Sequence, residues 1–156
     1  MTGNDVLNTC REKGLALAVA ESCTGGLLAA ELTRPAGASD VFLCGFVTYS
    51  NHAKQNLLGV PNATLEKFGA VSEETASAMA KGALEKSGAD MALSITGIAG
   101  PGSSEFKPEG RVCFGLSTQQ KTITQTVEFG AIGRDQVRAK SVSRALALLL
   151  DACNSA

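Results

Sequence analysis

The segment at residues 21–26, Glu-Ser-Cys-Thr-Gly-Gly, constrains the fold more than any other part of this chain. An apolar run at residues 15–20 precedes it, and a helix-like stretch at residues 27–33 follows it. A strand that breaks at such a turn and continues as a helix brings hydroxyl groups and free backbone N–H groups to one place. That place suits an anion, or a nucleophile beside an oxyanion hole. The segment therefore predicts a buried strand, a reactive turn and a helix in succession.

Three further segments rich in glycine and hydroxyl residues have the composition of loops that line a site. They lie at residues 48–54, 69–72 and 96–102, and the first of them supplies Tyr49 and Lys54. Ligands of open α/β sheets bind beyond the carboxyl ends of the strands. We therefore expect all four segments to meet near one edge of a sheet.

Strand-like and helix-like stretches alternate along most of the chain, and a hairpin comes late. The expected strands are residues 15–20, 41–49, 89–95, 111–118 and 122–129, and the expected helices are residues 4–13, 24–34, 51–58, a short turn from 62, 72–87 and 134–153. Asn51 and Ser72 are the expected caps of two helices. This order predicts the α/β class: a three-layer α/β/α sandwich with a mixed sheet, as a single domain over residues 1–156.

Composition narrows the classes of partner. The chain has 156 residues, of which 44% are hydrophobic, and this suits one compact domain with a core. Its net charge is −1, tryptophan is absent and there is one tyrosine, which argues against a nucleic-acid partner. The longest apolar run, residues 145–150, is too short to cross a bilayer. We expect a cytoplasmic protein without nucleic-acid or membrane partners.

The five cysteines contain no C-x-x-C pair, and their number is odd. This argues against a zinc site or a disulfide framework and predicts buried, reduced thiols. Cys23 differs from the others because it follows Ser22 at a helix start, where the pKa of a thiol could fall. It is therefore an alternative nucleophile.

Each motif can also be explained by a structural or surface role without catalysis. The turn at residues 22–26 matches neither G-x-S-x-G nor a P-loop, and Ser22 or Thr24 could act only as a helix cap. Lys54 could be a solvated surface lysine, and the lone His52 has no evident catalytic partners. Arg134 and Arg138 lie four residues apart and share a helix face, which makes either a solvated surface or a phosphate clamp.

Taken together, the segments resemble the CinA C-terminal domain family, whose enzymatic members are nicotinamide mononucleotide (NMN) amidohydrolases. The resemblance covers nearly the whole chain in the family's order. It rests on Ala20-Glu21-Ser22-Cys23-Thr24-Gly25-Gly26, Thr48-Tyr49-Ser50-Asn51 with Lys54, Gly69-Ala70-Val71-Ser72, Thr96-Gly97-Ile98-Ala99-Gly100-Pro101, Lys107-Pro108 with Gly110, and Arg134 with Arg138.

The resemblance implies hydrolysis of the NMN carboxamide to nicotinic acid mononucleotide and ammonia, with no metal or cofactor. Ser22 matches the family's nucleophile, Lys54 its general base, and Tyr49 a helper in proton transfer. The residues expected to bind substrate are Thr24, Gly25, Gly26, Asn51, Thr96, Gly97, Gly100 and Arg138. The resemblance also implies a homo-oligomer, a dimer or larger.

Chemistry sets a condition on this assignment. A serine hydroxyl needs a base, and lysine serves as a base only when its amine is neutral. Lowering a lysine pKa from about 10.4 to about 7.5 takes about 4 kcal/mol, which burial can supply. We therefore predict that Lys54 is buried and close to Ser22. Two other readings remain open: a nucleotide-binding module without turnover, linked to competence or the DNA-damage response, and a cysteine hydrolase that uses Cys23.

Overall fold

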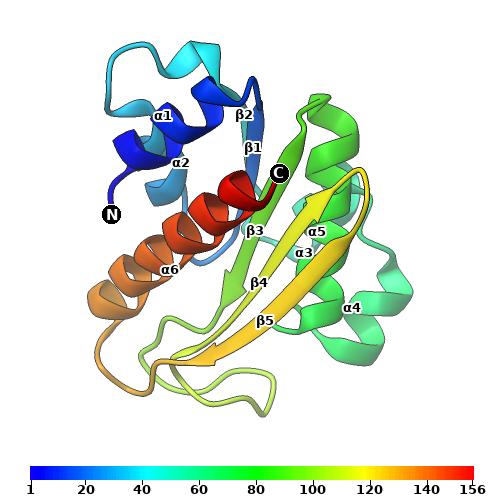
Figure 1. Cartoon of the computed structure of the whole chain (residues 1–156). Coiled ribbons are helices and arrows are strands. Elements are labelled where there is room, and N and C mark those ends of the chain that lie inside the picture. The colour runs from blue at the N-terminus through cyan, green and yellow to red at the C-terminus, as the bar shows by residue number, and fades with distance from the viewer.

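In the computed structural model, which describes residues 1–156, five strands form one mixed sheet with helices on both faces (Figure 1). The strands are β1 (Leu17–Glu21), β2 (Phe42–Val47), β3 (Met91–Gly97), β4 (Arg111–Thr118) and β5 (Thr122–Glu128). Their order across the sheet is β2-β1-β3-β4-β5. Strand β1 pairs in parallel with β2 and β3, whereas β4 is antiparallel to β3 and β5. The predicted α/β fold with a mixed sheet is confirmed.

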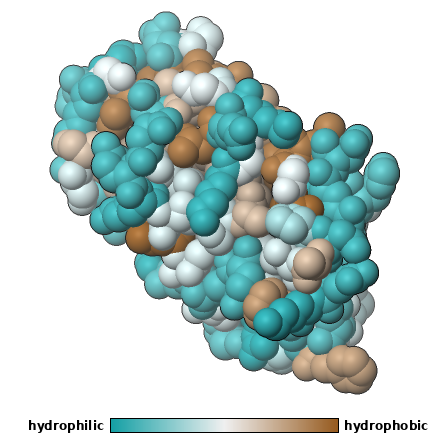
Figure 2. Space-filling view, turned by 90° about the vertical axis from the view of Figure 1, so that its right-hand side faces the viewer, coloured by the Kyte–Doolittle hydropathy of each residue, from teal (hydrophilic) through white to brown (hydrophobic).

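The helices divide between the two faces. One face carries α1 (Gly3–Glu12), α2 (Leu27–Thr33) and α6 (Arg134–Ser155), and the other carries α3 (Asn51–Leu58), α4 (Asn62–Phe68) and α5 (Glu73–Ser87), while a single 3₁₀ turn (Ala38–Asp40) precedes β2. The larger core lies under α1, α2 and α6, and a smaller one lies between the sheet and α5. Hydrophilic residues with small apolar areas between them cover the face seen in Figure 2, as is usual for a protein surface.

Local chemistry explains where α3 and α5 begin. Ser72 caps α5 as predicted, with its hydroxyl accepting from the Thr75 N–H. For α3 the predicted cap was wrong by one residue: the Ser50 hydroxyl accepts from the Ala53 N–H, and Asn51 is already the first helical residue. Both hydroxyl and amide side chains can cap a helix, so the sequence alone does not separate these neighbours.

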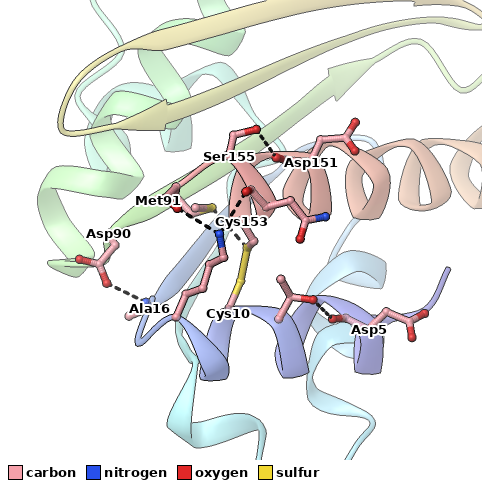
Figure 3. The surroundings of a disulfide bond; sticks show 12 residues. Asp5, Cys10, Ala16, Asp90, Met91, Asp151, Cys153 and Ser155 are labelled. Atoms are coloured by element: carbon pink, nitrogen blue, oxygen red, sulfur yellow. Dashed lines mark hydrogen bonds between the residues drawn. A yellow bond between two sulfur atoms is a disulfide. The ribbon is translucent and has the colours of Figure 1, made fainter.

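The prediction that all five thiols are reduced was wrong for one pair. Cys10 in α1 and Cys153 in α6 form a disulfide (Figure 3), with a Cα–Cα distance of 5.8 Å across 143 residues of sequence. The two helices pack side by side, which brings together cysteines that no local spacing relates. Cys23, Cys44 and Cys113 remain free. No helix is long and apolar enough to cross a membrane.

Candidate active site

The carboxyl ends of the three parallel strands meet at one edge of the sheet, and a cavity of about 310 Å³ lies there. All four predicted segments contribute to its walls, as expected. The lining residues that the sequence singled out as site residues are Ser22, Tyr49, Lys54, Thr96, Gly97 and Gly100. Parts of two loops, at residues 70–71 and 98–105, complete the walls together with Cys23 and Arg134.

Ser22 and Lys54 are in direct contact in this cavity. The Lys54 Nζ lies 2.9 Å from the Ser22 Oγ, 3.0 Å from the Thr48 carbonyl oxygen and 3.1 Å from that of Tyr49. The Lys54 side chain is 1% exposed and that of Ser22 is 8% exposed. The prediction that Lys54 is buried and close to Ser22 is confirmed.

The surroundings of Lys54 favour its neutral form. Burial lowers the pKa of the Lys54 amine, and the electrostatic effects of Cys23 and Glu105 oppose this shift. None of the ion pairs in the molecule involves Lys54. Its partners are two carbonyls, which only accept hydrogen bonds, and one hydroxyl, which can donate. A neutral amine fits this set, with two N–H groups for the carbonyls and a lone pair for the Ser22 hydroxyl.

The turn after Ser22 presents unused backbone donors. The N–H groups of Ser22, Gly25 and Leu27 donate to carbonyls of Ile95, Ser22 and Thr24. Those of Cys23, Thr24 and Gly26 form no hydrogen bond in the protein. Gly25 and Gly26 have φ angles of 56° and 105°, in the region that favours glycine. Of these three residues, Cys23 directly follows Ser22 and lines the cavity, so the turn offers at least one free N–H group there.

Cys23 does not have the properties of an activated thiol. Its side chain is 5% exposed, and burial raises its pKa to about 12. The expectation that the helix start lowers this pKa was wrong, because desolvation outweighs the nearby cations Arg138 and Lys54. The hydroxyl of Ser22, and not this thiol, contacts the Lys54 amine.

Arg134 joins two walls of the cavity. It lies at the first turn of α6 and donates to the Gly100 carbonyl at 2.7 Å and to the Tyr49 hydroxyl at 3.0 Å. A guanidinium has five N–H donors, so further donors remain for an anion. Tyr49 thus has its phenol tied to Arg134, while its backbone carbonyl accepts from Lys54.

Several predicted substrate-binding residues lie outside the cavity walls. Asn51 is exposed at the start of α3, and Thr24 is fully buried, with a hydroxyl that has no partner. Arg138 is half-buried and donates to the carbonyls of Cys23 and Thr24, so it supports the turn from behind. Gly25 and Gly26 shape the same turn without lining the cavity.

Sequence reasoning missed the part played by Glu21. This carboxylate is fully buried and accepts from the N–H groups of Leu28 and Ala29, at 2.9 Å each. It therefore replaces the side-chain cap that α2 lacks. The signal in the sequence is an acid placed directly before a glycine turn and a helix.

Sequence reasoning also missed that Glu105 and Lys107 tie two loops of the cavity together. The Glu105 carboxylate accepts from the Ala70 N–H, and the Lys107 Nζ donates to the carbonyls of Phe68 and Val71. No group of three or more His, Cys, Asp or Glu side chains is arranged to hold a metal ion.

Comparison with known proteins identifies the family of the chain. The family model of the CinA C-terminal domain matches residues 2–153. The chain belongs to the CinA C-terminal domain family. A CinA-like protein of Chloroherpeton thalassium is 58% identical over 112 residues, covering 71% of this chain and 27% of that protein. A CinA-like protein of Kosmotoga olearia is 48% identical over 142 residues, covering 90% of this chain and 34% of that protein.

Solved structures of CinA relatives have the same fold. The competence/damage inducible protein CihA from Agrobacterium tumefaciens has a TM-score of 0.93 at 44% identity, with 97% of this chain and 93% of that chain covered. A CinA superfamily protein from Klebsiella pneumoniae has a TM-score of 0.95 at 36% identity, with 99% and 96% covered. The chain thus spans about a third of the length of the curated relatives, 27% and 34% in the two cases above, and nearly all of these solved chains.

Proposed function

We propose that this CinA domain is an amidohydrolase that converts NMN to nicotinic acid mononucleotide and ammonia, with Ser22 as nucleophile and Lys54 as general base. One observation carries the proposal: the buried Lys54 amine lies 2.9 Å from the Ser22 hydroxyl and has no carboxylate partner. A structural lysine in such a place would be expected to pair with an acid, because an unpaired buried ammonium is costly.

The chemistry follows from these contacts. The neutral Lys54 amine takes the proton of the Ser22 hydroxyl while Oγ attacks the carboxamide carbon. The oxyanion that forms is stabilised by backbone N–H groups at the start of the turn, where the N–H of Cys23, a residue of the cavity wall, has no partner in the protein. The Lys54 ammonium then gives its proton to the leaving amide nitrogen, and ammonia departs. Lys54 is neutral again and activates a water molecule, which hydrolyses the Ser22 ester to the carboxylate.

The size of the cavity is compatible with a nucleotide as substrate. Its volume of about 310 Å³ is at the lower end of the range for small-molecule sites. Arg134 lines the cavity, whereas the donors of Arg138 are turned to the backbone of the turn. These contacts favour Arg134 over Arg138 as the partner of the 5′-phosphate.

Two measurements on the purified protein separate turnover from binding alone. We expect ammonia release from NMN, with a lower rate on nicotinamide riboside, which lacks the phosphate. Calorimetric binding of NMN without ammonia release over hours would instead favour a nucleotide-binding module. Absence of both binding and turnover would remove NMN as the substrate.

A further inference from the structure

The wall of the active-site cavity carries a single acid. Among the residues that line it, Glu105 alone has a carboxylate, and Lys54 and Arg134 supply the basic groups. The Glu105 side chain is 36% exposed, and its oxygens accept from one donor, the Ala70 N–H. A carboxylate has about four positions for hydrogen bonds, so most of this capacity is unused. The cavity therefore presents a negative charge as well as a positive one.

We propose that Glu105 is the counter-ion of a cationic ring in the substrate, so that it selects the positively charged form of a pyridine nucleotide. This inference rests on the proposed function, because it assigns a further contact to NMN. The pyridine ring of NMN carries a positive charge, and its phosphate is negative at neutral pH. A cavity that holds both Glu105 and Arg134 is complementary to these two charges, and a nucleotide with a neutral ring would lack one of the two attractions.

Glu105 lies close to the reacting groups without touching them. Its charge opposes the lowering of the Lys54 pKa, so the two side chains are near enough for an electrostatic effect. The hydrogen bonds of the Lys54 amine go to Ser22, Thr48 and Tyr49, and none goes to Glu105. In NMN the carboxamide is bonded directly to the charged ring, whereas the ribose separates the ring from the phosphate. A carboxamide held at Ser22 therefore brings the charge of the ring near Glu105.

A tight turn holds Glu105 in this position. Ser104 and Lys107 exchange two backbone hydrogen bonds, and the residues between them, Glu105 and Phe106, have φ angles of 53° and 62°. Turns with two positive φ angles favour asparagine and glycine, because this conformation strains most other residues. The Phe106 side chain is fully exposed, whereas Glu105 lines the cavity. Stability of the turn alone does not explain a glutamate at this position.

Glu105 also has a structural contact, which decides the variant to use. Its carboxylate fits against Gly69, where an added Cβ atom would collide with it. Lys107 Nζ lies 3.8 Å from this carboxylate, beyond hydrogen-bonding distance, and donates to two backbone carbonyls instead. Glu105→Gln keeps an oxygen that can accept from the Ala70 N–H but removes the negative charge. This variant therefore separates the effect of the charge from the tie between the two loops.

Calorimetric binding of two nucleotides tests the charge without turnover. On Ser22→Ala protein, NMN is compared with its dihydro form, which has a neutral ring and keeps the carboxamide, the ribose and the phosphate. We expect Glu105→Gln, introduced into the same protein, to lower the ratio of the NMN affinity to the dihydro-NMN affinity by about fivefold, the upper end of the range for exposed ion pairs. A difference in ring shape is the same in both proteins, so the change in this ratio reports the charge.

The matched control is Glu109→Gln on the same loop. The Glu109 carboxylate also accepts from a backbone N–H, that of Gly102, but it does not line the cavity, so the affinity ratio should stay unchanged. An unchanged ratio in Glu105→Gln, including an equal loss of affinity for both nucleotides, would overturn the proposal. Failure of Ser22→Ala protein to bind NMN would overturn it as well.

Ammonia release by the wild-type protein separates this inference from the proposed function. Normal release from NMN together with an unchanged affinity ratio in Glu105→Gln would overturn the counter-ion alone. No release from NMN together with the expected fall in the ratio would contradict the amidohydrolase and support a cation-selective nucleotide site.

Discussion

Two cavities lie at opposite ends of the sheet, and the proposed active site is the smaller of them. The cavity at the carboxyl ends of β1 and β3 measures about 310 Å³, whereas one at their amino ends, between the β4–β5 turn and the end of α6, measures about 640 Å³. The smaller one holds a buried amine against a hydroxyl. The larger one is lined by apolar side chains such as Leu116 and by acids such as Asp151.

The difference between them is one of desolvation and unused hydrogen-bonding capacity. At the smaller cavity Lys54 is buried without an acid, and three N–H groups of the turn lack acceptors. A fold that was optimised only for stability would have paired these groups. No buried side-chain nitrogen or oxygen without a hydrogen-bond partner lines the larger cavity. The rate of ammonia release from NMN should therefore respond strongly to substitutions at the smaller cavity and weakly to substitutions at the larger one.

Apart from the replacement of Ser22, the largest expected effect on ammonia release is that of Lys54→Met. This change keeps an aliphatic chain but removes the general base, and we expect kcat/KM for NMN to fall by about 10³-fold or more. Ammonia release measures it. The matched control is Lys67→Met on α4, an exposed lysine, which should retain wild-type turnover. Near-normal activity of Lys54→Met would remove Lys54 from its role.

The pH dependence should follow the neutral fraction of Lys54. Burial lowers the pKa of Lys54 from 10.5, and only the neutral amine accepts the Ser22 proton, so kcat/KM should rise with pH to a plateau. The midpoint should lie below 10.5 and should be absent from the residual activity of Lys54→Met.

The same pKa shift sets a stability trend. Between the lowered pKa and 10.5 the unfolded chain binds more protons at Lys54 than the folded one, so the free energy of unfolding should rise with pH in that window. Denaturant unfolding of the wild type and of Lys54→Met across this range would measure it, and parallel curves would contradict it.

A smaller effect is expected from Arg134→Ala. Loss of this guanidinium frees the Tyr49 hydroxyl and the Gly100 carbonyl and removes the proposed phosphate partner. We expect about a tenfold to hundredfold loss in kcat/KM for NMN, mostly through KM. On nicotinamide riboside the loss should be smaller. An equal loss on both substrates would assign Arg134 to loop positioning and not to phosphate binding.

The smallest effect is expected at the larger cavity. Asp151→Ala removes an exposed carboxylate there and should change ammonia release by less than about twofold, because no group of this cavity reaches the Ser22 site. A large change in kcat/KM with unchanged stability would show that the two ends of the sheet are coupled.

Local patterns in the sequence predicted the elements and part of the site. The run before Glu21, the glycine turn and the cap at Ser72 are features of neighbouring residues, and the structure has them close to where they were expected. Burial of Lys54 was predicted from the chemistry that its proposed role requires. The contact with Ser22 then follows from two parallel strands that end at the same edge.

Features that depend on how distant elements pack could not be predicted. The Cys10–Cys153 pair depends on where α1 crosses α6. The choice between Arg134 and Arg138 depends on which turn of α6 faces the cavity, and a spacing of four residues leaves both on one helix face. The rise in the Cys23 pKa depends on burial that its neighbours in the sequence do not reveal.

The most direct test of the central claim is ammonia release from NMN by Ser22→Ala, measured beside the wild-type protein and Cys23→Ala. The account predicts a loss of about 10⁴-fold or more in Ser22→Ala with calorimetric NMN binding retained, while Cys23→Ala stays within about tenfold of the wild type. Full ammonia release by Ser22→Ala, or loss of release in Cys23→Ala alone, would contradict it.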